Sequence, residues 1–327
     1  MKTRDITESF ERLDSLMPAV ERGIDLAVEN ACVNSPPLFT AVQRLLQTDG
    51  SGSTRYRLFP LALHAAMTGD PSPALPLAVI SRIWWTGAET LDDIMDGEFD
   101  SALTGLGHGQ AMIAAVTCTT LVPHIVIAEA AVAPAVATVL AAEFVATSLA
   151  CASGQIDDLD MGGHASWART MRSYVGKTGA PYERDAVMAA HLAGQDKERV
   201  RGWRAFGRLF GVLRQLSNDH AEGVVIDDAD MSNGVRTLFY AHAVEAGIVG
   251  GAGSSNLLRL SMIPPALLKT YLRRVESIAG QLYMLLDQLV HPSEHRDIVR
   301  WLIQTSLEQV RSADVFSHID TTREGLE

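Results

Sequence analysis

The sequence predicts an all-α protein, and three observations lead to that prediction. Apolar residues make up 47% of the 327-residue chain and recur at helical spacing along most of it. Alternating β-branched runs, which are typical of strands, are few, whereas alanine, a strong helix former, is abundant. Clusters of glycine and proline separate the helical stretches, so we expect roughly ten helices of ordinary length. These clusters are Asn34–Pro37, Asp49–Gly52, Gly69–Pro76, Gly97–Gly109, Gly162–Gly163, Gly223–Gly234, Gly250–Gly253 and Pro264–Pro265.

The organisation of the chain and its charge narrow the possible functions. No fixed-period repeat, low-complexity tract or long polar linker divides the sequence, so we expect a single domain over residues 1–327. The formal net charge of −12 would repel the phosphates of nucleic acid, and we expect no nucleic-acid partner. Three widely spaced cysteines cannot make a complete disulfide framework, and the N-terminus lacks a secretory signal. We therefore expect a cytoplasmic location.

Two long uncharged stretches raise the question of membrane insertion. No Asp, Glu, Lys or Arg occurs from Ser101 to Ala128, and Ala130–Ala142 is also uncharged. Both stretches are built mainly from small or polar residues, with few Leu or Phe and no flanking basic cluster to set a topology. We expect buried helices of a soluble protein and no stable membrane insertion.

A first group of carboxylates ends an apolar helix that contains Trp84 and Trp85. Asp92, Asp93 and Asp96 are three and four residues apart, so they share one side of the helix end. Like charges repel there unless a cation lies among them, and oxygen ligands of this kind suit Mg²⁺. An isolated motif of this type is more often a solvated acidic helix end. The metal site is therefore a hypothesis that needs support from the rest of the chain.

A second polar group, Gln215–Gly223, ends another amphipathic segment. Asn218 and Glu222 are four residues apart, and Asp219 lies beside the first of them. Two helix ends that each present oxygen ligands could face each other across a bundle and hold several Mg²⁺ ions with a diphosphate between them. The apolar stripe on this segment (Phe206, Leu209, Phe210, Leu213) is interpreted as core packing.

Five motifs in a fixed order then connect the sequence to a family. They are Asp92–Asp96 (DDIMD), Gly154–Leu159 (GQIDDL), Tyr174–Ala180 (YVGKTGA), Gln215–Glu222 (QLSNDHAE) and Asn233–Leu238 (NGVRTL). Together they resemble the trans-isoprenyl diphosphate synthase, or polyprenyl synthetase, family. The resemblance implies the all-α class I isoprenoid synthase fold with a central cavity. It also implies an enzyme that binds an allylic prenyl diphosphate through Mg²⁺ and ionises it. We further expect a homodimer.

The resemblance assigns roles to individual residues. Metal ligands would be Asp92, Asp93, Asp96, Asn218, Asp219 and Glu222. Lys177 and Arg236 would act on the diphosphate, although a lysine near a helix end can also be a surface residue, and an arginine in a loop can be merely solvated. Substrate contacts would come from Arg57, Trp85, Gly87, Ala88, Gln155 and Gln215, with Asp158 lining or supporting the site.

Departures from the family concern the acceptor, isopentenyl diphosphate. The acceptor-binding element keeps its arginine as Arg57, but its lysine is Thr54. The acceptor-binding histidine seven positions before the first aspartate is Trp85, and Gly97–Gly105 lacks the usual arginine pair. Because charge-assisted bonds dominate phosphate recognition, ordinary chain elongation with isopentenyl diphosphate is in doubt.

Four functions remain open. The first is a terpene cyclase, in which the ionised chain is attacked by its own double bonds and Trp85 lines the cation pocket. The others are a prenyltransferase with a different acceptor, a conventional elongating synthase and a non-catalytic subunit; the intact aspartate motif argues against the last. We favour the cyclase. The small residues Gly87 and Ala88 predict a pocket floor that admits C15 or C20 chains, unless they serve only close helix packing.

Overall fold

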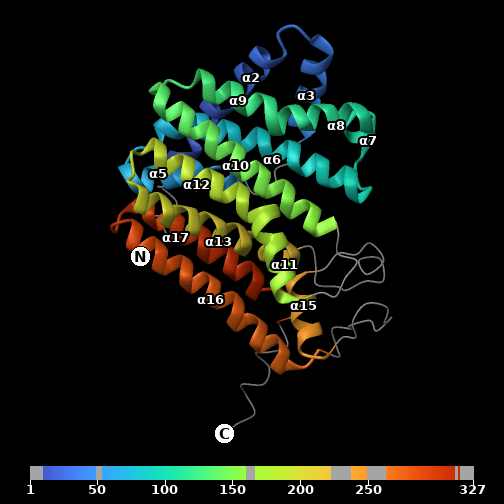
Figure 1. Ribbon diagram of the computed structural model, residues 1–327, viewed down its shortest axis with the longest axis vertical. Coiled ribbons are helices and arrows are strands. Elements are labelled where there is room, and N and C mark those ends of the chain that lie inside the picture. The colour runs from blue at the N-terminus through green and yellow to red at the C-terminus, as the bar shows by residue number, and fades with distance from the viewer. Residues whose placement is uncertain are drawn as a thin grey trace. The chain divides into compact units, whose positions relative to one another are not determined.

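The computed structural model describes residues 10–48, 54–159, 166–221, 237–248, 263–313 and 316. Every regular element within these ranges is a helix, and none is a strand (Figure 1). The all-α prediction is therefore confirmed. The chain divides into two compact units, which are taken separately below. Unit 1 comprises Met1–Phe144, Met188–Val200 and Pro292–Val299, and unit 2 comprises Val145–Val187, Arg201–His291 and Arg300–Glu327. The expectation of a single domain stays a prediction.

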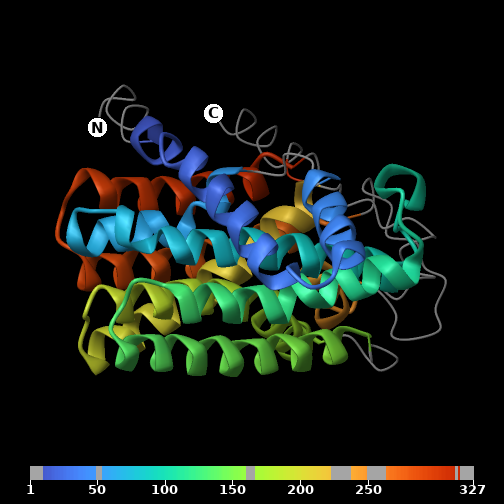
Figure 2. The same cartoon turned by 90° about the horizontal axis from the view of Figure 1, so that it is seen from above.

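Unit 1 is built around one long helix, α6 (Leu75–Asp96). This helix begins with Pro76 in its first turn and ends at Gly97, whose φ of 78° makes the left-handed cap that glycine adopts most easily. It packs against α2 (Met17–Cys32), α8 (His108–Val116), η2 (Thr117–Leu121) and α9 (Val122–Glu129) (Figure 2). The remaining elements of this part of the chain are α3 (Pro36–Thr48), α4 (Thr54–Arg57), α5 (Phe59–Thr68), η1 (Ser72–Ala74) and α7 (Ser101–Thr104).

Unit 2 contains α11 (Trp167–Tyr174), η3 (Val175–Gly179), α15 (Leu238–Glu245) and α16 (Pro265–Leu289). Four longer helices have residues in both units: α10 (Pro134–Leu159), α12 (Ala180–Leu192), α13 (Lys197–Ala221) and α17 (Glu294–Arg311). On α13, Phe206, Phe210 and Leu213 are buried, and Leu209 is half-buried. Three of the four residues interpreted as core packing therefore lie in the core.

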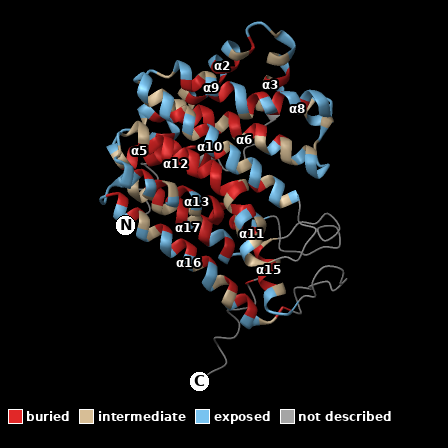
Figure 3. Cartoon of the chain, in the orientation of Figure 1, coloured by how far each residue is buried: buried red, intermediate tan, exposed pale blue. Residues whose placement is uncertain are grey.

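Helix α10 differs from its prediction. We expected Ala130–Ala142 to be buried, but most of that stretch is half-buried or exposed, and only Leu140 is buried. Exposed positions continue along the rest of α10 (Figure 3). The apolar content of a helix does not reveal which neighbours cover it, and here few do. Two helices, His108–Glu129 and Pro134–Leu159, are long and apolar enough to span a membrane by length and composition alone.

Candidate functional site

The first acidic motif lies at the C-terminal end of α6 in unit 1. Asp92, Asp93 and Asp96 are all in the last turns of this helix, as the sequence predicted. The end of a helix carries a partial negative charge, so carboxylates are least favourable there. Partial desolvation raises the pKa of the Asp93 carboxyl, and the charges of Asp92, Glu98 and Asp96 raise it further. The arrangement is therefore one that a bound cation would relieve.

Three predicted substrate residues lie near the middle of α6. Trp85 is half-buried and meets Trp84 edge to face, with ring centroids 5.2 Å apart. Gly87 is buried where α6 meets η2, and a Cβ there would lie 2.7 Å from the carbonyl oxygen of Ala115. Gly87 therefore serves close packing within unit 1. Ala88 is half-buried.

Arg57, at the end of α4, is nearly buried and forms an ion pair with Glu89 on α6. Its Nη2 lies 3.2 Å from the Glu89 carboxylate. This partner offsets part of the positive charge that the acceptor site would use. The side chain of Thr54 lies outside the described residues.

In unit 2, two glycines bring α10 against η3, which is a π-helical turn. A Cβ on Gly154 would lie 2.4 Å from both Gly176 Cα and Lys177 N. A side chain at either glycine would push the two segments apart, because no real Cβ tolerates such a contact. The close approach explains why glycines occur in both the GQIDDL and YVGKTGA motifs. It also brings the C-terminal end of α10 next to Lys177. Single π turns inside helices are often found at functional sites.

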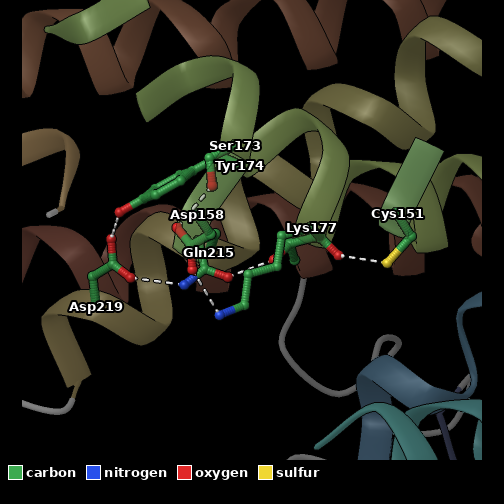
Figure 4. A network of polar contacts seen from close by, with 8 residues as sticks. Cys151, Asp158, Ser173, Tyr174, Lys177, Gln215 and Asp219 are labelled. Atoms are coloured by element: carbon green, nitrogen blue, oxygen red, sulfur yellow. Dashed lines mark hydrogen bonds and ion pairs between the residues drawn. The ribbon is translucent and has the colours of Figure 1, made fainter. Parts of the chain in front are cut away.

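Lys177 is fixed by residues of the neighbouring segments (Figure 4). Its Nζ donates to Asp158 Oδ2 at 3.1 Å, and Ser173 Oγ donates to the other oxygen of Asp158 at 2.8 Å. The thiol of Cys151 donates to the main-chain oxygen of Lys177 at 3.4 Å. The Lys177 side chain is 25% exposed, so its ammonium group is held in place but still reaches solvent.

Asp219, near the end of α13, accepts hydrogen bonds on both carboxylate oxygens (Figure 4). Tyr174 OH donates to Oδ2, and Gln215 Nε2 donates to Oδ1 at 2.9 Å. Thr178 Oγ1 in turn donates to Gln215 Oε1. Burial raises the pKa of Tyr174 well above its usual value, and the charge of Asp219 adds to the rise, so the phenol remains a donor at neutral pH.

Asn218 lies beside Asp219 but has a different partner. Nη2 of Arg214, one helical turn earlier on α13, donates to Asn218 Oδ1 at 2.8 Å. Arg214 is buried, and its Nη1 donates to Ser217, Ser306 and Gln309. One lone pair of the Asn218 oxygen remains after this bond.

A neutral histidine and aromatic rings surround the end of α13. Burial lowers the pKa of His220 to about 4, so at neutral pH it brings no positive charge to its neighbour Asp219. The His220 ring lies 5.6 Å from that of Tyr271 and 6.3 Å from that of Phe239. One ring nitrogen, Nε2, is 3.0 Å from Tyr271 OH.

The predicted site residues thus fall into two groups. Unit 1 contains Arg57, Trp85, Gly87, Ala88, Asp92, Asp93 and Asp96, and unit 2 contains Gln155, Lys177, Gln215, Asn218 and Asp219. Gln155 is half-buried on α10. Glu222 and Arg236 lie outside the described residues. Among the residues that are described, no three His, Cys, Asp or Glu side chains form a ready metal cluster.

Tyr174, Thr178 and Arg214 contact predicted site residues but were not themselves assigned roles from the sequence. Tyr174 and Thr178 belong to the motif that contains Lys177, so their position in it was the available signal. Arg214 is four residues before Asn218 and therefore on the same helix face, a spacing that could have indicated the contact.

Comparisons with known proteins bear on the fold. No protein-family model and no curated protein sequence matches this chain. The structure is similar to a geranylgeranyl pyrophosphate synthetase from the archaeon Geoglobus acetivorans, with a TM-score of 0.72 and 18% identity over 90% of this chain and 98% of that one. A polyprenyl synthetase from Streptomyces coelicolor has a TM-score of 0.70 and 18% identity, over 90% of this chain and 98% of that one. A polyprenyl synthase from Caulobacter crescentus, complexed with calcium and isoprenyl diphosphate, has a TM-score of 0.68 and 16% identity, over 91% of this chain and 97% of that one.

These identities are low, so the likeness shows the fold alone. It extends over nearly the whole length of each solved structure. The chain therefore has the all-α fold of the prenyl diphosphate synthases, as the resemblance of its motifs implied.

Proposed function

We propose that the protein is a cytoplasmic, Mg²⁺-dependent isoprenoid synthase that ionises an allylic prenyl diphosphate. The observation that carries the proposal is the hydrogen-bonded network around the short segment Tyr174–Thr178. This segment contains Lys177, which pairs with Asp158, and it orients Asp219 through Tyr174 directly and through Thr178 by way of Gln215. A cationic group for a diphosphate and a carboxylate for a metal are thus built into one structure. Each stands at the motif position where the resembled family has its functional residue.

The donor set suits a hard divalent cation. Three carboxylates lie at the end of one helix, those of Asp92, Asp93 and Asp96. Partial desolvation, and then the neighbouring negative charges, raise the pKa of Asp93. Mg²⁺ is usually bound by one or two carboxylates together with substrate phosphates, so a complete protein cage is not required. Bound there, Mg²⁺ would neutralise the charge that develops on the leaving diphosphate. Asp219, Glu222 and, more weakly, Asn218 are the second set of proposed ligands, since Arg214 already donates to the Asn218 oxygen.

The chain's own cations would bind the diphosphate directly. Lys177 presents a compact positive charge, and the hydrogen bond that it donates to Asp158 restricts the motion of its ammonium group. Arg236 is proposed as a second cation, and Gln155 and Gln215 as polar contacts to substrate.

For the fate of the cation we propose cyclisation. Trp85, where the family has an acceptor-binding histidine, supports it. Chain elongation is the second candidate, and it is favoured by the structural neighbours, which include a geranylgeranyl pyrophosphate synthetase and a polyprenyl synthetase. Transfer to another acceptor remains the third.

One set of incubations separates these reactions. Purified protein and Mg²⁺ are mixed with geranyl, farnesyl or geranylgeranyl diphosphate, with and without labelled isopentenyl diphosphate, and products are identified by mass. Hydrocarbon or alcohol formed without isopentenyl diphosphate indicates cyclisation, whereas label in a longer diphosphate indicates elongation. Absence of pyrophosphate release from every donor, under all conditions, would contradict the proposed function.

Ala88 tests the length of the donor. With Gly87 occupied by packing against η2, Ala88 is the small residue of the pair that we propose to limit the pocket floor. Farnesyl or geranylgeranyl diphosphate should be used with higher kcat/KM than geranyl diphosphate, since each buried CH₂ adds about 0.8 kcal/mol. Ala88→Phe should invert this order, as measured by steady-state kinetics on each donor. Unchanged selectivity in that variant would show that Ala88 only packs.

A homodimer is also proposed, with α10 as part of its interface. Val145, Leu149 and Ile156 are four and seven residues apart, hence on one face, and Leu149 is 68% and Ile156 66% exposed. Such a face on a helix with little burial marks an association surface. Light scattering should give twice the mass of the chain. A monomer that binds lipid vesicles would instead identify α10 as a membrane-contacting helix.

A further inference from the structure

Tyr174 occupies an unusual position in the network, and the inference drawn from it rests on the proposed function. It is the last residue of α11, and only 6% of it is exposed. Its hydroxyl contacts two residues on different elements, Asp219 near the end of α13 and Leu238 at the first position of α15.

We propose that Tyr174 is a positioning residue that holds the Asp219 carboxylate in the orientation required to bind a divalent metal.

The direction of the hydroxyl proton follows from the second contact. The main-chain N–H of Leu238 donates to Tyr174 OH at 3.2 Å. An N–H in the first turn has no acceptor within its own helix, so this bond gives the Leu238 N–H an acceptor that the helix does not provide. Because the phenol oxygen is the acceptor of that bond, its single proton is directed to Asp219. The Tyr174 hydroxyl therefore donates its proton to the Asp219 carboxylate.

The Asp219 carboxylate then accepts a hydrogen bond on each of its two oxygens. Gln215 donates to Oδ1, while Tyr174 donates to Oδ2, so rotation of the carboxylate about its terminal bond would break one bond or both. Partners that orient a ligating carboxylate in this manner raise metal affinity by about 10–100-fold.

The experiment compares Tyr174→Phe with a matched control, Tyr271→Phe. Tyr271 is the other fully buried tyrosine nearby, but its hydroxyl pairs with His220 rather than with a carboxylate. Binding of Mn²⁺ in the presence of inorganic pyrophosphate is followed by the loss of the free-Mn²⁺ signal in electron paramagnetic resonance. Turnover of farnesyl diphosphate is measured against Mg²⁺ concentration, and thermal unfolding is recorded without metal.

Tyr174→Phe should weaken Mn²⁺ binding about tenfold and raise the half-saturating Mg²⁺ concentration by a similar factor. Tyr271→Phe should change both by less than about twofold, although it also loses a buried hydroxyl. In an Asp219→Asn background, Tyr174→Phe should have no further effect on Mn²⁺ binding, because its action passes through that carboxylate. Tyr174→His keeps a polar ring but is too short to reach Asp219, so it should weaken binding likewise and provides the test if the Phe variant does not fold.

Two outcomes would overturn the proposal in distinguishable ways. If the wild type is active and either Tyr174 variant binds Mn²⁺ as well as Tyr271→Phe does, the proposed function stands and Tyr174 is a packing residue only. If the wild type binds no Mn²⁺ with pyrophosphate and releases no pyrophosphate from any allylic donor, the proposed function itself fails, and the role of Tyr174 with it.

Discussion

The two acidic helix ends of this protein are built in opposite ways. At the end of α6, Asp92, Asp93 and Asp96 repel one another, and partial desolvation together with this repulsion raises the pKa of Asp93. Near the end of α13, Asp219 accepts a hydrogen bond on each oxygen from Tyr174 and Gln215. The first group places like charges close together, whereas the second carboxylate is held by hydrogen bonds from the protein. The difference indicates that the first motif gains most from a metal, whereas the second is organised before any metal arrives.

The largest effect is expected from Asp92→Ala/Asp93→Ala. Pyrophosphate release should fall by at least roughly 10³-fold, equivalent to about 4 kcal/mol of transition-state stabilisation, because metal ligands are lost. The melting temperature without metal should stay the same or rise, since repelling charges are removed. Calorimetry measures the melting temperature, and a pyrophosphate assay measures the rate of release. Asp25→Ala, which removes an exposed carboxylate from α2 in the same unit, is the control and should change neither.

Full turnover by the double variant would contradict the class I assignment. A large loss of metal-free stability would instead show that these carboxylates have structural partners that outweigh their repulsion.

Asp219→Ala should behave differently and so sharpens the contrast. It leaves the Tyr174 hydroxyl and the Gln215 amide without the acceptor of their hydrogen bonds. We expect this loss to lower the free energy of unfolding by about 1–3 kcal/mol without metal. Urea unfolding of both variants under the same conditions measures this. Equal metal-free stabilities for Asp219→Ala and the Asp92→Ala/Asp93→Ala variant would show that the two helix ends are not built differently.

Asn218→Ala should have the smallest effect. Arg214 retains Ser217, Ser306 and Gln309 as partners, and Asn218 contributes no charge to a cation. We expect turnover to fall only a few-fold and the free energy of unfolding to change by less than about 1 kcal/mol. Steady-state kinetics with varied Mg²⁺ provides the measurement. A loss as large as that of the Asp92→Ala/Asp93→Ala variant would make Asn218 a full metal ligand.

Much of the local structure could be predicted from the sequence, because it depends on short spacings. The helix that ends at Asp96 before Gly97, and the amphipathic segment that ends after Gln215, were both expected from periodicity and a glycine stop. The exposure of α10 could not be predicted, since composition does not reveal which helices pack against it. Similarly, the bond between Tyr174 and Leu238 joins residues 64 positions apart, and only the folded chain brings them together.

Because Val175–Gly179 forms a π turn, the number of residues in this segment matters to the site as much as their identities do. A π turn contains one residue more than a regular helix needs, so deleting one residue, Val175 for instance, would restore ordinary helical hydrogen bonding at little local cost. That deletion would, however, rotate Tyr174 relative to Lys177 by about 100° around the helix axis. Tyr174 could then no longer reach Asp219 while Lys177 reached Asp158. Deleting a residue from this turn should therefore leave the helix folded but break the contacts on which the proposed site depends.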